Sequence, residues 1–333
     1  MQLRSLALAL LALWFAALAP MPAGAQGLAF VLNSGQASLS LIDVQQRREL
    51  RRVPLLREPH HMALSPDGKS LLVGDTGANA IFFLDPLTGA VQKRLPVSDP
   101  YQLQFSPDGK CLTVAGLARN QIDIYDAASL QLAHRIPAAA MPSHMNYAPD
   151  SRVVYVSLQQ TDRLVAIEVA SGRVLWNAVV GSTPAGVLWH DGAVLVALMG
   201  ADDVAVVDPV DGHVERRVVT GRGAHNMFVS PDARLIYVAN RVDGSIAALD
   251  AASLAVQRSF RVSGGPDDLD FAPDGTIWVT RRFAHSIGFL DPRSGQYTTL
   301  EVGRSPHGIW LDTHMPAPTR ISMNAGAMKA GGP

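Results

Sequence analysis

Residues 59–97 read PHHMALSPDGKSLLVGDTGANAIFFLDPLTGAVQKRLPV, and this stretch decides the fold. It holds four short apolar runs, at 61–64, 70–73, 80–84 and 91–97, separated by Pro-Asp-Gly or Thr-Gly turn signals. Short apolar runs between such turns are typical of β-strands, and no sustained helical period competes with them. The unit therefore predicts a four-stranded antiparallel sheet.

The same unit recurs at intervals of about 41 residues. Its opening Pro, or the residue that replaces it, stands at Pro59, Pro100, Pro142, Pro184, Ala224, Pro266 and Pro306. An acidic residue closes the third run at the same interval, at Asp43, Asp85, Asp126, Glu168, Asp208, Asp250 and Asp291. Four-stranded units of this length that repeat around a ring form the blades of a β-propeller. The sequence predicts an all-β propeller with seven blades.

The two ends of the chain complement each other. The first unit supplies three strands, at 29–32, 38–42 and 49–53, but no Pro-led inner strand. The last unit has only that strand, at 307–311. We therefore expect both ends to share one blade, which closes the ring and removes the exposed edges of an open array. The propeller is predicted to span residues 26–313.

The segments outside the propeller carry different signals. Arg4, the apolar run 6–18 and an Ala-x-Ala cleavage site before Gln26 predict a secretory signal peptide over residues 1–25. Export to a bacterial periplasm follows, with no membrane span after cleavage; the alternative is an uncleaved signal anchor. Residues 314–333 are rich in Met, Ala, Gly and Pro and predict a disordered tail.

Composition narrows the class of partner. A formal net charge of −1 argues against duplex nucleic acid as a ligand. With 48% hydrophobic and 17% charged residues, the chain can bury a large core. Single-stranded nucleic acid would need a basic groove lined with aromatic residues, and at 6% aromatic content that alternative stays open. The single cysteine, Cys111, cannot form an internal disulfide.

Several runs resemble a known repeat. LIYVAN at 235–240 followed by GSIAALD at 244–250, and TIWVT at 276–280 followed by SIGFLD at 286–291, are similar to the YVTN-type β-propeller repeat. The resemblance covers nearly all of the chain after residue 25. It implies an exported seven-bladed propeller related to those of nitrous oxide reductase and of d1-haem proteins. Such propellers include enzymes, cofactor carriers and non-catalytic binding proteins, so the function stays open.

Polar residues concentrate directly after the Pro positions, where the inner strands begin. Since all inner strands start at one mouth of the ring, side chains far apart in sequence should meet there. The first residues after the Pro positions are His60, Tyr101, Ser143, Ala185, His225, Asp267 and His307. The second residues are His61, Gln102, His144, Gly186, Asn226, Asp268 and Gly308. Ring closure predicts one contiguous arc of His225, Asp267, His307, His60 and Tyr101.

Imidazole and carboxylate groups bind Zn, Cu, Ni and Fe ions, and imidazole is an axial ligand of haem iron. The arc therefore predicts His60, His225, His307 and Asp267 as ligands of a transition metal or a haem-type cofactor. The alternative is that each histidine only hydrogen-bonds the neighbouring blade at the turn. No Cys-x-x-Cys-His haem-attachment motif occurs.

Arginines are predicted on the same face. Loops between the second and third strands carry Arg119, Arg163, Arg241, Arg281 and Arg282, and Arg57, Arg222 and Arg304 precede inner strands. Guanidinium groups around one concavity favour carboxylate or phosphate ligands. The predicted ligand-binding set is His60, His61, His144, Arg57, Arg222, Arg304 and Arg281. Aspartates in the same loops leave a solvated rim of mixed charge as the alternative.

Three functions are compatible with these residues. The first is a non-catalytic periplasmic propeller that binds a partner protein or a small anionic ligand as an accessory to a redox system. The second is a metal- or haem-dependent redox protein. The third is a lactone hydrolase with Glu58 as a base beside His60. Signatures of serine hydrolases and of phosphate-binding loops are absent from the sequence.

Overall fold

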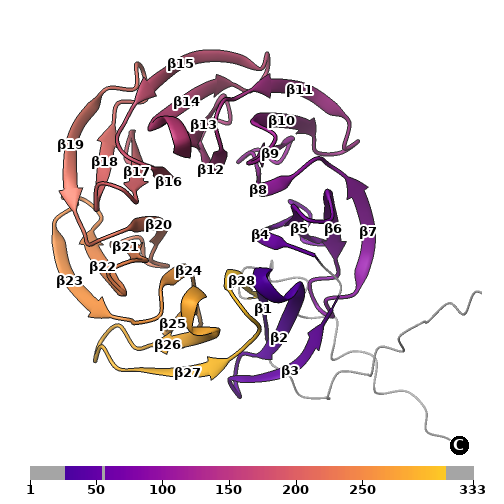
Figure 1. Cartoon of the computed structure of the whole chain (residues 1–333), viewed down its shortest axis with the longest axis vertical. Helices are drawn as coiled ribbons and strands as arrows, with labels where there is room; N and C mark the ends of the chain where they lie inside the picture. The colour runs from indigo at the N-terminus through magenta and orange to yellow at the C-terminus, as the bar shows by residue number, and fades with distance from the viewer. Residues whose placement is uncertain (1–26, 55–56, 313–333) are drawn as a thin grey trace, which may run out of the picture.

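A computed structural model describes residues 27–54 and 57–312 and confirms the seven-bladed, all-β propeller (Figure 1). The predicted signal peptide and C-terminal tail lie outside the described residues. Within the described ranges no helix is long and apolar enough to cross a membrane. The helices found there are three single 3₁₀ turns, η1 (Ser34–Gln36), η2 (Gln159–Thr161) and η3 (Arg282–Ala284).

The inner strands surround the ring axis and begin at the predicted Pro positions. They are β4 (Pro59–Leu64), β8 (Pro100–Phe105), β12 (Pro142–Tyr147), β16 (Pro184–His190), β20 (Ala224–Val229), β24 (Pro266–Phe271) and β28 (Pro306–Leu311). All seven start at the same face of the ring, which we call the cluster face.

The second and third strands of each blade are almost wholly buried, because blades cover both of their faces. The second strands are β1 (Leu28–Asn33), β5 (Leu71–Asp75), β9 (Cys111–Gly116), β13 (Val153–Leu158), β17 (Ala193–Leu198), β21 (Leu235–Asn240) and β25 (Ile277–Arg281). The third strands are β2 (Ser38–Asp43), β6 (Ala80–Leu84), β10 (Gln121–Asp126), β14 (Arg163–Glu168), β18 (Asp203–Val207), β22 (Ser245–Asp250) and β26 (Ser286–Leu290).

The outer strands form the rim and are mostly exposed (Figure 1). They are β3 (Arg48–Val53), β7 (Val91–Pro96), β11 (Leu132–Pro137), β15 (Arg173–Val179), β19 (Val214–Val219), β23 (Val256–Arg261) and β27 (Tyr297–Glu301). Apolar clusters lie between neighbouring blades; one joins Ile122 of β10 to Val156 of β13, for example. Burial of apolar surface between blades therefore holds the ring together.

The predicted closure of the ring is confirmed. Strand β28 pairs antiparallel with β1, and the first blade has the order β28-β1-β2-β3. Phe30 and Trp310 stand opposite each other in that pairing, with ring centroids 5.4 Å apart in an edge-to-face arrangement. Both ends of the described chain thus contribute to one sheet.

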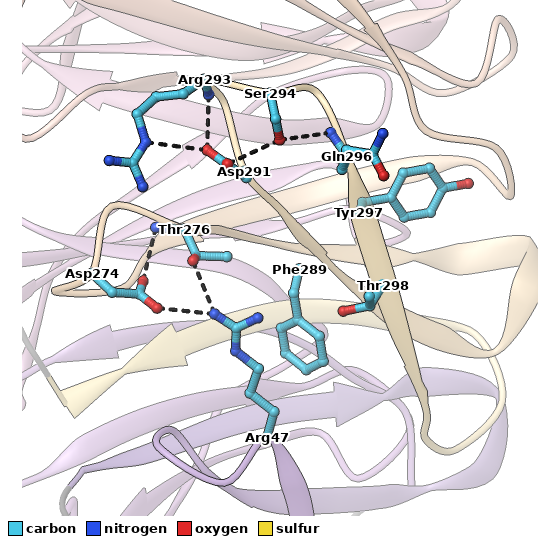
Figure 2. A pocket seen from close by; sticks show the side chains of 10 residues that line it. All are labelled: Arg47, Asp274, Thr276, Phe289, Asp291, Arg293, Ser294, Gln296, Tyr297 and Thr298. Atoms are coloured by element: carbon cyan, nitrogen blue, oxygen red, sulfur yellow. Dashed lines mark hydrogen bonds and ion pairs between the residues drawn. The ribbon is translucent and has the colours of Figure 1, made fainter.

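A second contact fastens the first blade to the last on the outside (Figure 2). Arg47, in the turn between β2 and β3, donates to Asp274 at 2.9 Å and to Thr276 at 3.0 Å. Its guanidinium also lies over the ring of Phe289, 5.1 Å from the centroid. Arg47, Asp274, Thr276 and Phe289 line a surface pocket, which therefore lies where the first blade meets the last.

Candidate functional site

Each inner strand begins with a β-bulge. The pairing of β4 with β5 shifts register between Pro59 and Met62, so His60 and His61 lie in the bulge. The other six inner strands show a register shift at the same position. A bulge breaks the strict alternation of side chains between the two faces of a sheet. Consecutive side chains can therefore both turn toward the ring axis.

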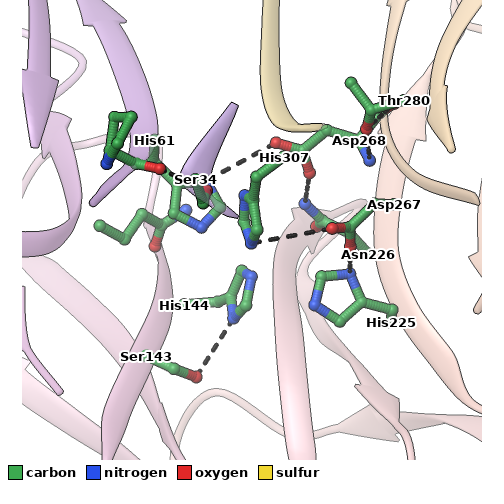
Figure 3. A network of polar contacts seen from close by, with 12 residues as sticks. Ser34, His61, Ser143, His144, His225, Asn226, Asp267, Asp268, Thr280 and His307 are labelled. Carbon is green, nitrogen blue, oxygen red and sulfur yellow. Dashed lines mark hydrogen bonds and ion pairs between the residues drawn. The ribbon is translucent and has the colours of Figure 1, made fainter. Parts of the chain in front are cut away.

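Eight of these side chains meet on the axis, and we call them the axial cluster: His60, His61, Tyr101, His144, His225, Asp267, Asp268 and His307. Figure 3 shows His61, His144, His225, Asp267, Asp268 and His307. Each residue is at most 8% exposed. The ring centroids of His61 and His307 lie 4.6 Å apart, and those of His60 and His307 lie 5.2 Å apart. His144 lies 5.1 Å from both His61 and His225. Five imidazoles from four blades therefore form one continuous set of ring contacts, with His60 and His61 both supplied by β4.

Asp267 is the anionic centre of the cluster. Its buried carboxylate is contacted by Arg241, by Arg282 Nη1 at 3.2 Å and by His225 Nδ1 at 2.9 Å. His307 Nε2 lies 3.8 Å away. Burial opposes ionisation of this carboxyl, but the positive charge of Arg241 and the contact with His225 outweigh it and hold the pKa of Asp267 well below its ordinary value. Asp267 is thus a carboxylate that positions the groups around it.

The tautomer of His225 follows from its neighbours. Arg241 Nη2 lies 2.6 Å from His225 Nε2, and a guanidinium only donates hydrogen bonds. Nε2 therefore accepts, and Nδ1 carries the hydrogen that faces Asp267. Because Nδ1 carries the hydrogen and the lone pair of Nε2 accepts from Arg241, His225 has no lone pair to offer a ligand.

Asp268 behaves in the opposite way from the adjacent Asp267. Burial and the neighbouring carboxylate raise the pKa of Asp268 to about 7. Asn226 Nδ2 donates to Asp268 Oδ1 at 2.9 Å, and Oδ2 lies 3.6 Å from His61 Nδ1. The hydroxyl of Thr280 pairs with the main chain of Asp268 on both sides, accepting from its N–H and donating to its carbonyl. The carboxyl is thus held in place next to His61.

His61, Asp268 and His307 form a group with the arrangement of metal ligands. One possible ligand atom from each lies within 4.8 Å of the others, and all three residues are buried. Two imidazole nitrogens and one carboxylate oxygen are donors that Zn²⁺ and other divalent transition metals accept. The three residues come from β4, β24 and β28, which the bulges bring together on the axis.

Several buried imidazole nitrogens lack a hydrogen-bond partner within the described residues. They are both nitrogens of His307, Nε2 of His61, Nε2 of His144, Nδ1 of His60 and, although it lies 2.9 Å from Asp267, Nδ1 of His225. Burial lowers the pKa of His61, His144 and His307 well below the ordinary value, and that of His60 to about 4. The four rings are therefore neutral at pH 7, with a lone pair on each. Leaving a buried polar atom unpaired costs about 1–3 kcal/mol. So many unpaired nitrogens in one place therefore indicate a site for a ligand that would pair with them.

The predicted arc of His225, Asp267, His307, His60 and Tyr101 is found as one contiguous set. The structure also draws in His61, His144 and Asp268 from the second positions, because the bulges turn both positions inward. Among the predicted metal ligands, His307 belongs to the three-residue group, whereas Asp267 and His225 pair with arginine. His60 is buried at the edge of the cluster, with Nε2 3.6 Å from the exposed Glu58. The roles of these residues as ligands stay predictions.

The arginines at the cluster are Arg241 and Arg282. Of the predicted set, Arg57, Arg222 and Arg304 are exposed, and Arg222 faces Asp243 at 3.6 Å. Arg281 instead donates to the carbonyl of Ser263 at 2.7 Å and to Ser286 at 2.9 Å. Adjacent arginines on one loop thus turn in different directions, which the sequence pattern does not reveal.

A family model for YNCE-like β-propellers matches residues 5–317, so the chain belongs to the YNCE-like β-propeller family. A search of curated protein sequences finds no match.

Solved structures share the fold at low sequence identity. A crystal structure of a functionally unknown protein from Desulfotomaculum acetoxidans is 12% identical, with a TM-score of 0.74, over 85% of this chain and 98% of that one. Kuenenia stuttgartiensis hydrazine synthase is 20% identical, with a TM-score of 0.64, over 82% of this chain and 92% of that one. The dihydro-haem d1 dehydrogenase NirN, in complex with DHE, is 17% identical, with a TM-score of 0.65, over 85% and 74%. These similarities define the fold alone.

Proposed function

We propose that the protein is a metal-binding propeller whose axial cluster holds one divalent transition-metal ion on His61, Asp268 and His307. The observation that carries the proposal is the set of buried, neutral imidazole nitrogens without partners beside a carboxyl group. An ion would use one lone pair of His61 and one of His307 and would favour the ionised form of Asp268. Asp267 keeps the adjoining groups in place, as carboxylates near metal-binding histidines commonly do.

The resemblance of the repeat to d1-haem propellers makes a haem-type cofactor an alternative ligand of the axial cluster. The imidazoles of the cluster contact one another at centroid distances of 4.6–5.2 Å. Such spacing suits a single ion among the rings and leaves no room there for a macrocycle. We therefore favour the ion over a haem-type cofactor.

Three protein ligands leave a coordination position for an exogenous molecule, which is usual in functional rather than purely structural zinc sites. The proposal thereby joins two functions expected from the sequence, metal dependence and the binding of a small ligand. The periplasmic location predicted from residues 1–25 is part of the same proposal.

The test is metal binding by the mature chain after removal of bound metal with a chelator. Titration with Zn²⁺, Co²⁺, Ni²⁺ and Cu²⁺ in a calorimeter should give one tight site per chain for at least one of these ions. The same ion should show binding at least a hundredfold weaker in a His61→Ala/His307→Ala double variant. Asp268→Asn keeps the shape of the side chain, and we expect it to weaken binding by tenfold or more.

The matched control is His134→Ala/His190→Ala, because these histidines lie outside the cluster and bond to backbone carbonyls. Its affinity should equal that of the original protein. Circular dichroism at the titration temperature verifies that each variant is folded. Absence of a tight site, or an unchanged site in both the double variant and Asp268→Asn, would refute the proposal.

A further inference from the structure

Arg282 has an unused carboxylate-binding edge beside the axial cluster. It donates through Nη1 to Asp267 Oδ2 at 3.2 Å. Within the described residues, no protein group accepts from its Nε or Nη2, and its side chain is 22% exposed. These two nitrogens form the flat edge of the guanidinium that donates two parallel hydrogen bonds.

The protein itself shows what that edge binds. Arg135 donates through Nε and Nη2 to the two carboxylate oxygens of Asp123, both at 2.8 Å. Arg52 uses the same two nitrogens on Glu49, at 2.8 and 2.7 Å. A planar carboxylate is therefore the ligand that matches the unoccupied edge of Arg282.

The sum of the charges around the cluster also favours an anionic ligand. Arg241 and Arg282 bring two positive charges, which the carboxylates of Asp267 and Asp268 can balance. A bound divalent ion adds two more, and the five imidazoles contribute none while they are neutral. A buried site with surplus positive charge is stabilised by an anionic ligand.

The position of Arg282 suits this role. The side chains of Arg241 and Arg282 are 18% and 22% exposed, whereas His307 and Asp267 are fully buried. Solvent therefore reaches the cluster from the side of the two arginines.

From these observations we infer that a small carboxylate binds at the cluster face, held by the Nε–Nη2 edge of Arg282 and completing the coordination of the axial metal ion. This inference rests on the proposed function. It identifies the class of ligand or substrate as a small carboxylic acid that enters from the cluster face.

The experiment uses the Co²⁺-loaded protein, whose visible absorption bands report the ligands of the ion. Titration with acetate should shift these bands in a saturable manner. Arg282→Gln should bind acetate at least tenfold more weakly, because it loses a charge-assisted pair of hydrogen bonds. Arg261→Gln, the same substitution on the outer strand β23, should titrate like the original protein. Should Arg282→Gln fail to fold, Arg282→Lys keeps the charge, loses the fork and should also bind acetate more weakly.

The outcomes separate the two proposals. If no Co²⁺ bands form, the metal site itself is refuted. If the Co²⁺ bands form but do not shift with acetate, only the carboxylate site is refuted. The same holds if the Arg282 variant binds acetate as tightly as the original protein. A response to inorganic phosphate without one to acetate would overturn the assignment of the ligand as a carboxylate.

Discussion

The two ends of the inner strands differ in whether their polar groups have hydrogen-bond partners. At the turn between the inner and second strands, Ser65 Oγ donates to Asp67 Oδ1 at 2.7 Å and accepts from the N–H of Ser70 at 2.9 Å. The same network recurs in two further blades, at Ser106 with Asp108 and at Ser230 with Asp232. At the opposite end of the inner strands, the axial cluster leaves buried imidazole nitrogens without partners.

The difference separates structure from function within one repeat. The turn residues repeat because each turn must satisfy its own backbone groups, and Ser, Pro, Asp and Gly do so locally. Residues in the bulges need only fit around the axis, so they differ from blade to blade. A site for a ligand can therefore form at the bulges without altering the fold.

The largest expected effect is a loss of stability at low pH, which comes from the axial cluster and not from the turns. Burial lowers the pKa of all five cluster histidines, which are His60, His61, His144, His225 and His307. As pH falls below 6.5, the unfolded state takes up these protons before the folded state does. The free energy of unfolding should then drop by up to about 1.4 kcal/mol per pH unit for each group, or several kcal/mol in total by pH 5.

Asp268 opposes this trend, because its folded pKa of about 7 lies above the ordinary value of 3.8. One carboxyl regains stability on acidification while five imidazoles lose it, so the net change remains a loss. Urea unfolding of the metal-free protein at pH 7.5, 6 and 5 measures it. Equal stability at all three values would contradict neutral, buried imidazoles.

Removing the anionic centre should have the next largest effect. Asp267→Ala leaves the guanidinium groups of Arg241 and Arg282 beside each other without their carboxylate. Breaking such a buried ion pair from one side costs about 3–5 kcal/mol. Urea unfolding at pH 7.5 should show this loss, and Glu301→Ala on the exposed outer strand β27 is the control. A loss below about 1 kcal/mol would mean that Asp267 does not organise the cluster.

The repeat predicted the fold in detail, including the shared blade, because period and turn chemistry are local properties of the sequence. It also predicted that His60, His225, Asp267 and His307 would be neighbours, since ring closure determines which strands are adjacent. These predictions needed no knowledge of side-chain direction.

The composition of the proposed metal group was harder to predict. Asp268 and His61 turn toward the axis only because a bulge interrupts the alternation after Pro266 and after Pro59, and bulges leave no clear signal in sequence. The choice between Arg281 and Arg282 depends on where a strand ends and a 3₁₀ turn begins. A one-residue difference there decides which guanidinium reaches the cluster.

The smallest expected effect tests whether the turns are as self-contained as their hydrogen bonds indicate. Ser106→Ala removes a hydroxyl that donates to Asp108 at 2.7 Å and accepts from the N–H of Cys111 at 2.9 Å. The loss should be about 1 kcal/mol in urea unfolding, because part of each bond is replaced by water.

Ser65→Ala and Ser230→Ala should give nearly the same value as Ser106→Ala, since the three networks have the same geometry. None of the three should change metal affinity, because the turns lie at the end of the inner strands opposite the cluster. If one of them did weaken metal binding, the turn and the bulge of that blade would be coupled. The division of each blade into a structural end and a functional end would then be wrong.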